Sequence, residues 1–235
     1  MTREARGEGG RDERLARARE RMLDLLQAHI QDERVLAAMA EVPRERFVPP
    51  DLAPYAYEDS ALPIGYGQTI SQPLMVAMMT EAIGPRPEDR VLEVGTGCGY
   101  QAAVLSRLVR EVVTVERVAP LTERARQTLA DLGYENVTVH QAVREMGWPE
   151  DAPYDAIVVT AGAPHVPRSL LGQLAKAGRM VIPVGPLRAQ ELVRVRKTDH
   201  GIELTRLGPC GFVPLIGEEA WGESAGRASD RASGE

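Results

Sequence analysis

The apolar residues of this chain follow a helical period at first and later alternate between strand-like and helical patterns. From about residue 13 to 40 they recur every three or four positions, which predicts two helices with a break near 31–33. After residue 90, the expected strands are 90–94, 112–116, 137–140, 155–159 and 179–184, and the expected helices are 100–109, 120–132 and 168–176. Strands that alternate with helices predict a mostly parallel α/β sheet with helices on both faces.

Three other stretches depart from this alternation. Prolines predict an irregular, extended segment over 43–59, and residues 61–83 begin as a glycine-bearing loop and continue as a helix. ELVRVRK (191–197) and GIELTRL (201–207) alternate around TDHG, which predicts an antiparallel hairpin at the sheet edge. CGFVPLIG (210–217) is expected to add a last short strand.

These elements predict a single domain over 13–217, with a helical and loop addition (13–83) and a core (84–217). A chain of 235 residues is long enough for one well-buried α/β domain with additions, and too short for two. The Gly- and charge-rich ends, 1–12 and 218–235, are expected to be disordered tails.

Composition narrows the functional classes. The net charge of −6 argues against nucleic acid as a partner, and no apolar run approaches the roughly 20 residues that span a bilayer. The start of the chain, MTREARGEGGRDER, contains no apolar signal region, so a cytoplasmic protein is expected. Two cysteines and four scattered histidines show no ligand spacing, so we expect no metal site. We also expect a monomer.

The stretch VLEVGTGCGY (91–100) holds the clearest candidate chemistry. A β-branched run broken by glycines and followed by a helical pattern predicts a strand, a tight turn and a helix, where backbone N–H groups can approach a ligand. Glu93 precedes the glycines, and Glu116 ends the next strand, where a carboxylate can bind ribose hydroxyls. Acidic residues on both sides of the turn favour a cationic nucleoside, S-adenosylmethionine. Tyr100 and Glu93 disfavour a nicotinamide cofactor, and a turn without any ligand is the plainer alternative.

Ser71 lies where the loop 61–70 meets the following helix, with Pro73 in the first turn. Local physics alone predicts that its hydroxyl caps this helix.

The chain resembles the protein-L-isoaspartate (D-aspartate) O-methyltransferases over about residues 20–217. The resemblance rests on LPIGYGQTISQP (62–73), VLEVGTGCGYQAAVLS (91–106), IVVTAGAPHVP (157–167), PVGP followed by Gln190, and FVPL (212–215). It implies a class I, Rossmann-like methyltransferase that uses S-adenosylmethionine to methylate the side-chain carboxylate of isoaspartyl and D-aspartyl residues in damaged proteins. The ester would then cyclise to a succinimide and so begin repair.

The resemblance also implies roles for individual residues. Ser71 would be the catalytic residue that orients the acceptor carboxylate. The expected cofactor-binding residues are Glu93, Gly95, Thr96, Gly97, Gly99, Glu116, Gln141 and Ala142. The expected substrate-binding residues are Ile70, Thr160, Ala161, His165 and Val166.

One departure concerns the adenine subsite. Such enzymes usually carry Gly-Asp-Gly after the third strand, where this chain has Gln141, Ala142 and Val143. Gln141 or Glu145 could supply the missing acceptor if the loop is rearranged. Two alternatives therefore stay open: a methyltransferase for aspartate in a dedicated peptide, and a relative with weakened cofactor binding that acts as a binding protein.

Overall fold

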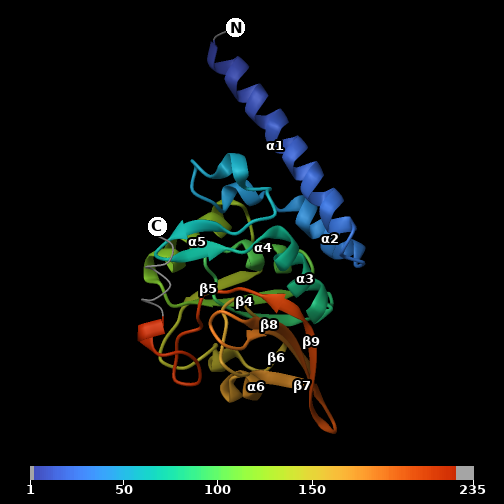
Figure 1. The fold of residues 1–235 in the computed structure, drawn as a ribbon, viewed down its shortest axis with the longest axis vertical. Coiled ribbons are helices and arrows are strands. Elements are labelled where there is room, and N and C mark those ends of the chain that lie inside the picture. Colours follow the sequence, from blue (N-terminus) through green and yellow to red (C-terminus); the bar gives the residue numbers. More distant parts are fainter. Residues whose placement is uncertain (1–2, 226–235) are drawn as a thin grey trace.

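The centre of the structure is a seven-stranded sheet, in which five parallel strands are followed by two antiparallel ones (Figure 1). The computed structural model describes residues 3–225. The strand order is β5-β4-β3-β6-β7-β8-β9. The bounds are β3 Arg90–Val94, β4 Glu111–Glu116, β5 Val137–Gln141, β6 Tyr154–Val159, β7 Leu174–Val184, β8 Gln190–Thr198 and β9 Gly201–Cys210. The mostly parallel sheet with an antiparallel edge is thus confirmed.

Helices cover the two faces of this sheet unequally. Alternate residues of each strand enter one of two apolar cores, so that Val91 belongs to the first and Leu92 to the second. Figure 1 shows α3 (Pro73–Ile83), α4 (Tyr100–Ser106) and α5 (Ala119–Asp131) on one side of the sheet and the short α6 (Arg168–Gln173) on the other. Irregular segments complete the second face.

Two predicted helices end earlier than expected. α4 ends at Ser106 and α6 at Gln173, three residues short in each case. After α6 the chain enters β7 at once, because Leu174 already pairs with Tyr154 of β6. β7 therefore begins five residues before the predicted strand, across an irregularity that contains Ala177 at a φ of 61°.

The amino-terminal addition consists of α1 (Arg3–Gln27) and α2 (Glu33–Glu41), with the expected break between them. The sequence predicted a disordered tail over 1–12, whereas α1 already includes residues 3–12; residues 1–2 lie outside the described part. Arg, Glu and Ala in this stretch are good helix formers and extend the helix that begins to pack at Leu15. Figure 1 shows the start of α1 projecting away from the domain.

The segment 62–70 is a β-hairpin rather than the predicted loop. β1 (Leu62–Gly65) and β2 (Gln68–Ile70) pair antiparallel around Tyr66 and Gly67, both of which have positive φ. Such a two-residue turn suits a hairpin, and it hides strands of three or four residues from a periodicity search. The preceding segment 43–59 is irregular as expected, apart from two single 3₁₀ turns, η1 (Arg44–Arg46) and η2 (Ala53–Tyr55).

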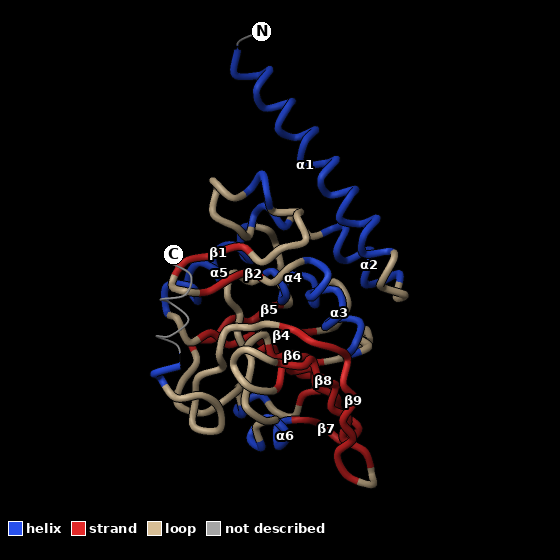
Figure 2. Tube along the Cα trace, in the orientation of Figure 1, coloured by secondary structure: helices blue, strands red, loops and turns tan. Residues whose placement is uncertain are grey.

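The carboxyl-terminal segment after β9 is a long loop rather than a strand (Figure 2). It is attached to the core by isolated bridges, such as that between Pro214 and Gly162. Residues 218–225 were expected to be disordered, but they form turns and contacts with the core, including hydrogen bonds between Gly217 or Leu215 and Trp221. Composition concealed this, because a few side-chain contacts anchor a Gly- and Glu-rich stretch. Residues 226–235 lie outside the described part.

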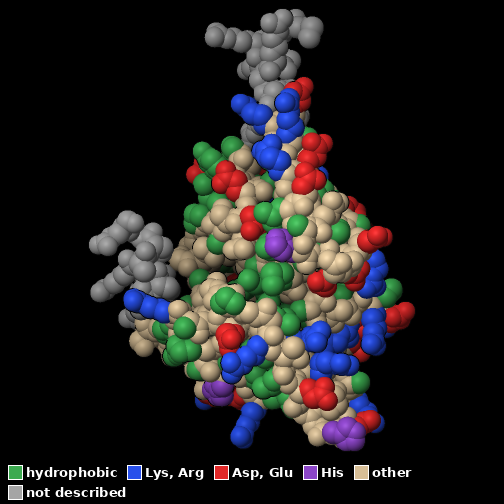
Figure 3. Space-filling view, turned by 45° about the vertical axis from the view of Figure 1, so that its right-hand side comes forward, with side chains coloured by type: hydrophobic (Ala, Val, Ile, Leu, Met, Phe, Trp, Pro, Cys, Tyr) green, Lys and Arg blue, Asp and Glu red, His purple; other side chains and the backbone are tan. Residues whose placement is uncertain are grey.

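Charges of both signs are interspersed on the face in Figure 3, where apolar side chains gather near the middle. No helix within residues 3–225 is long and apolar enough to cross a membrane. In the same range, no group of three or more His, Cys, Asp or Glu side chains could hold a metal ion. A 3₁₀ turn, η3 (Pro149–Asp151), completes the regular elements.

Candidate active site

The glycine turn, residues 95–99, joins the end of β3 to α4. Its three glycines have φ values of 102°, 54° and 92°, in the left-handed region that a side chain strongly disfavours. A Cβ on Gly95 would collide with the hydroxyl of Thr160, and one on Gly99 would lie 3.1 Å from Leu129. Glycine is therefore needed at Gly95 for a close backbone approach and at Gly99 for packing of α5.

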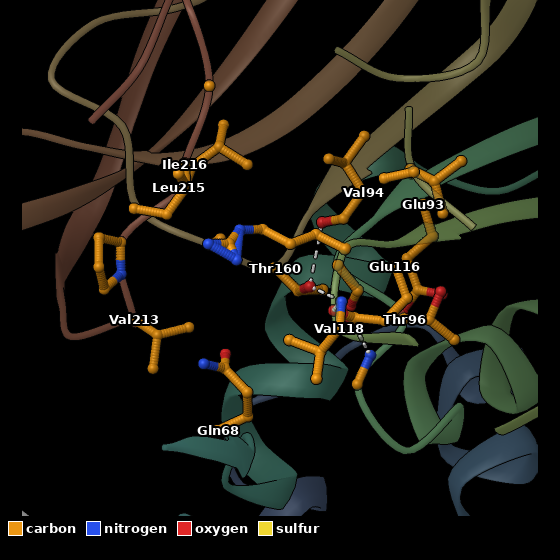
Figure 4. A pocket seen from close by; sticks show the side chains of 18 of the residues that line it. Gln68, Glu93, Val94, Thr96, Glu116, Val118, Thr160, Val213, Leu215 and Ile216 are labelled. Atoms are coloured by element: carbon orange, nitrogen blue, oxygen red, sulfur yellow. Dashed lines mark hydrogen bonds between the residues drawn. The ribbon is translucent and has the colours of Figure 1, made fainter. Parts of the chain in front are cut away.

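Glu116 closes the turn from the neighbouring strand. Its carboxylate accepts one hydrogen bond from the Gly97 N–H (2.8 Å) and another from the Val118 N–H (2.8 Å). These bonds fix the carboxylate between the glycine turn and the start of α5, and each oxygen retains a lone pair for a ligand. Figure 4 shows Glu116 and Thr96 close together at this edge of the sheet.

Glu93 lies deeper, with no exposed surface. The Thr114 hydroxyl donates to its Oε2 at 2.5 Å, and the Thr96 hydroxyl lies 2.6 Å from that of Thr114. Oε1 has no hydrogen-bond partner among residues 3–225. Burial, helped by the nearby charge of Glu116, raises the pKa of Glu93 to about 8, although the Thr114 hydrogen bond opposes the shift. A cationic ligand would provide the missing partner.

These groups line a cavity of about 830 Å³ at the carboxyl ends of the parallel strands. Its wall comes from the β1–β2 hairpin, the glycine turn, the ends of β4 and β6, the loop 142–147 and the carboxyl-terminal segment. Figure 4 shows Glu93 and Glu116 on one side and Val213, Leu215 and Ile216 on the other. Of the residues predicted for the site, the cavity is lined by Ile70, Ser71, Glu93, Gly95, Thr96, Gly97, Glu116, Ala142, Thr160 and Ala161.

Ser71 lines the same cavity as the glycine turn, and it does not cap α3. The N-cap residue is Gln72, which makes no side-chain cap bond. Instead, Asp59 Oδ1 accepts from the Leu74 N–H at 2.9 Å, so a side chain from the irregular segment satisfies the helix start. The capping alternative for Ser71 is therefore wrong, and its hydroxyl is not used by the helix.

The hairpin that precedes Ser71 packs directly against α5 and the glycine turn. Arg124 of α5 donates to the Ile64 carbonyl at 2.5 Å. A Cβ on Gly97 would lie 3.3 Å from the Ile64 side chain, so the hairpin covers the glycine turn. Contact between these two segments brings Ser71 into the same cavity as the glycine turn.

Four predicted site residues lie outside the cavity wall: Gly99, Gln141, His165 and Val166. Gln141 is turned away, since its side chain accepts from Thr122 (3.0 Å) and donates to the carbonyls of Glu116 and Arg117. His165 is exposed, and Val166 packs against the second core. The remaining one, Gly99, serves packing as described above.

Sequence reasoning missed part of the wall. Met146 lines it from the loop after β5, beside Glu145, which the sequence had offered as an acceptor, and Trp221 and Glu223 line it from the predicted tail. The quoted FVPL motif was the one available signal, because Gln190 bonds both backbone groups of Phe212, at 2.7 and 3.0 Å, and so fixes where this segment enters the site.

Known proteins resemble this chain over most of its length. Residues 17–220 match the family model described as Protein-L-isoaspartate(D-aspartate) O-methyltransferase. The Protein-L-isoaspartate O-methyltransferase of Pelotomaculum thermopropionicum is 50% identical over 224 residues, which cover 94% of this chain and 98% of that protein. The protein of the same name from Roseiflexus sp. (strain RS-1) is 55% identical over 207 residues, covering 88% and 95%.

Solved structures agree. A protein-L-isoaspartate O-methyltransferase matches with a TM-score of 0.76 at 32% identity, over 86% of this chain and 67% of that one. A Plasmodium falciparum structure described as an enzyme of this kind, in complex with S-adenosyl-L-homocysteine, matches with a TM-score of 0.72 at 25% identity, over 84% and 97%. This chain therefore belongs to the protein-L-isoaspartate(D-aspartate) O-methyltransferase family.

Proposed function

We propose that this protein transfers a methyl group from S-adenosylmethionine to the side-chain carboxylate of L-isoaspartyl and D-aspartyl residues in damaged proteins, and so begins repair through a succinimide. Membership in the family and the names of its relatives support this activity. The observation that carries it is a single cavity whose lining combines Glu93, the glycine turn and Glu116 with Ser71.

The residues of the cavity fit the cofactor. Gly95 and Gly97 present bare backbone to the space, and Glu116 offers oxygens for two ribose hydroxyls. The unpartnered Oε1 of the buried Glu93 suits the positive end of the molecule. The P. falciparum relative was solved with S-adenosyl-L-homocysteine, the product of such a reaction.

The adenine amine requires an acceptor that the usual aspartate would supply. Gln141 is engaged elsewhere, and Ala142 has no polar side-chain atom. Glu145 lines the cavity from the same loop, and we assign the adenine amine to its carboxylate. This assignment keeps an acidic acceptor although its position in the loop has shifted.

The chain's contribution to the reaction is positioning. When bound, S-adenosylmethionine would supply an electrophilic methyl group, to which a carboxylate oxygen of the substrate would bond while the electron pair of the broken carbon–sulfur bond passes to sulfur. The acceptor carboxylate, with a pKa near 4, is already ionised and needs no general base. The Ser71 hydroxyl would donate a hydrogen bond to one carboxylate oxygen and leave the other for attack. Ile70, Thr160 and Ala161 would hold the peptide, while the carboxyl-terminal segment excludes water.

Two assays test the proposal. Calorimetry should detect binding of S-adenosylmethionine, and a labelled methyl group should be transferred to an isoaspartyl peptide but not to its aspartyl twin. Methylation of the aspartyl twin would instead support a peptide-specific aspartate methyltransferase. Absence of cofactor binding at millimolar concentration would support the binding-protein alternative. That the protein acts as a monomer in the cytoplasm, without nucleic acid or membrane partners, stays a prediction from the sequence.

A further inference from the structure

Arg44 is an arginine with no exposed surface in a segment that the sequence predicted only to be irregular. It forms no ion pair with any described residue. Burial lowers its pKa, because the charged form loses water that no carboxylate replaces. Taking a guanidinium out of water costs free energy, which its hydrogen bonds must offset.

The contacts of Arg44 connect three segments that are distant in sequence. Its Nε donates to the Ala56 carbonyl (2.6 Å), and Nη2 donates to the Ser71 carbonyl (2.7 Å). The guanidinium lies 4.7 Å from the ring centroid of Tyr100, the first residue after the glycine turn. Nη1 is buried and has no hydrogen-bond partner in the described part of the chain. One planar group thus contacts the backbone of Ser71 and the first residue of α4, the helix that follows the glycine turn.

We propose that Arg44 is a positioning residue for methyl transfer, because it fixes the backbone of Ser71 relative to the glycine turn through Tyr100. The inference rests on the proposed function and on the role of Ser71 in it. In-line transfer depends steeply on the distance between acceptor and donor, and a misplacement of about 1 Å costs on the order of a hundredfold in rate. Only the planar fork of arginine reaches two carbonyls and an aromatic face together.

The test measures kcat, KM and cofactor affinity in Arg44→Met and Arg44→Lys. Met fills a comparable volume without donors, and Lys keeps the charge but not the fork. Both variants should lower kcat at saturating substrates by about tenfold or more. The Kd for S-adenosyl-L-homocysteine should change less than about twofold, because the hydrogen bonds of Arg44 go to the carbonyls of Ala56 and Ser71 and not to Glu116 or the glycine turn. Should Arg44→Met fail to fold, Arg44→Lys gives the same comparison.

A double-mutant cycle with Ser71→Ala separates positioning from a structural role. If Arg44 acts through Ser71, adding Arg44→Met to Ser71→Ala should lower kcat by less than about threefold. Independent, multiplicative losses would overturn the proposal. Arg179→Met is the control: Arg179 is largely buried and also donates to carbonyls, those of Ile83 and Gly84 at the far end of α3, and it differs from Arg44 in its ion pair with Asp89. It should lower stability, leave kcat within about twofold, and combine multiplicatively with Ser71→Ala.

The possible failures are distinguishable. A wild type that binds the cofactor but does not methylate an isoaspartyl peptide would overturn the proposed function and this inference with it. Full activity of Ser71→Ala would leave the function intact but remove the residue through which Arg44 acts. Arg44 variants with unchanged kcat and only a lower melting temperature would show a purely structural arginine.

Discussion

The two sides of the cavity are built in different ways. One side, which we assign to the methyl donor and call the donor side, consists of the glycine turn and Glu116. These come from the ends of neighbouring parallel strands, and the sheet itself brings them together. The other side, which we assign to the methyl acceptor and call the acceptor side, contains Ser71. This residue follows a two-stranded hairpin that lies outside the main sheet. Side chains from other segments hold the hairpin and the residues that follow it. Arg124 donates to the Ile64 carbonyl in the hairpin, Arg44 donates to the Ser71 carbonyl, and Asp59 accepts from the Leu74 N–H at the start of α3.

This difference has a mechanical consequence. The donor side inherits the rigidity of β3 and β4, because each of these strands pairs with a neighbouring strand on both sides. A single substitution there should therefore affect ligand contacts more than geometry. The acceptor side depends on a few charged or polar anchors. A change at one anchor should move the acceptor without disturbing cofactor binding, which makes kcat and cofactor Kd separable quantities.

The largest expected effect is at Ser71. Ser71→Asp should lower kcat/KM by about a hundredfold or more, since a second carboxylate repels the acceptor, and Ser71→Ala by about tenfold or more because a hydrogen bond is lost. Because Ser71 does not cap α3, neither change should lower the free energy of unfolding by more than about 0.5 kcal/mol. Steady-state kinetics and urea unfolding measure both quantities. Full activity of the aspartate variant would remove Ser71 from the mechanism.

At Glu116 a large effect is expected on cofactor binding rather than on the acceptor. Glu116→Ala removes the oxygens assigned to the ribose and should weaken cofactor binding by about 1.5–3 kcal/mol, or about tenfold to a hundredfold in Kd. The KM for the peptide should hardly change, since the acceptor side is anchored independently. Calorimetry with S-adenosyl-L-homocysteine gives the first quantity. An unchanged Kd would mean that the ribose lies elsewhere.

The same difference between the two sides explains what sequence could predict. The donor side was predictable, because Glu93, the glycines and Glu116 are placed by strands whose apolar runs are evident and whose ends meet at one edge. The family motif placed Ser71 in the site, yet local rules assigned its hydroxyl to the helix. They could not show that Asp59, twelve residues earlier in the chain, performs this task instead.

Other parts of the site were unpredictable for the same reason. The burial of Arg44 depends on Tyr100 and Ala56, which no local pattern connects to it. Gln141 was expected at the cofactor, but two backbone carbonyls and Thr122 give its amide a more complete set of partners away from the cavity. Such choices between competing hydrogen bonds are made by tertiary structure.

The pH dependence of binding should sharpen the comparison further, because burial places a titrating group on the donor side. Glu93 has its pKa raised from 4.5 to about 8. Between these values the unfolded chain ionises this group while the folded chain keeps it protonated, so stability should fall as pH rises from about 4.5 to 8. Cofactor binding prefers the ionised form, so Kd should decrease by about tenfold between pH 6 and 8.

Glu93→Gln provides the control, since it keeps the shape of the side chain without a titrating proton. Its cofactor Kd should be weaker at pH 8 and nearly independent of pH over the same range. Calorimetry in buffers of different ionisation enthalpy should detect proton release on binding to the wild type alone. An equal pH slope in both proteins would assign the titration to another group.

The smallest effect is expected from the carboxyl-terminal segment, which spans the two sides. Two ion pairs attach it to the donor side: Glu218 with Arg144 (2.7 Å) and Glu223 with Arg117 (2.6 Å). All four side chains are largely exposed, and such pairs contribute at most about 1 kcal/mol each. Glu218→Ala combined with Glu223→Ala should therefore raise the dissociation rate of S-adenosyl-L-homocysteine by only about two- to threefold, while kcat for bound substrates stays close to wild type.

Salt identifies the origin of this effect. The wild-type dissociation rate should rise between 50 mM and 500 mM NaCl, as screening weakens exposed pairs, and the double variant should show little further change. Asp199→Ala serves as the control, because it breaks the exposed ion pair between Asp199 in the distant β8–β9 turn and Lys176 of β7. It should leave both the dissociation rate and its salt dependence unaltered. Stopped-flow displacement measures all three proteins. If the double variant matches the wild type at low salt, the two exposed ion pairs do not hold this segment, and the hydrogen bonds of Gln190, Gly162 and Glu219 keep it in place instead.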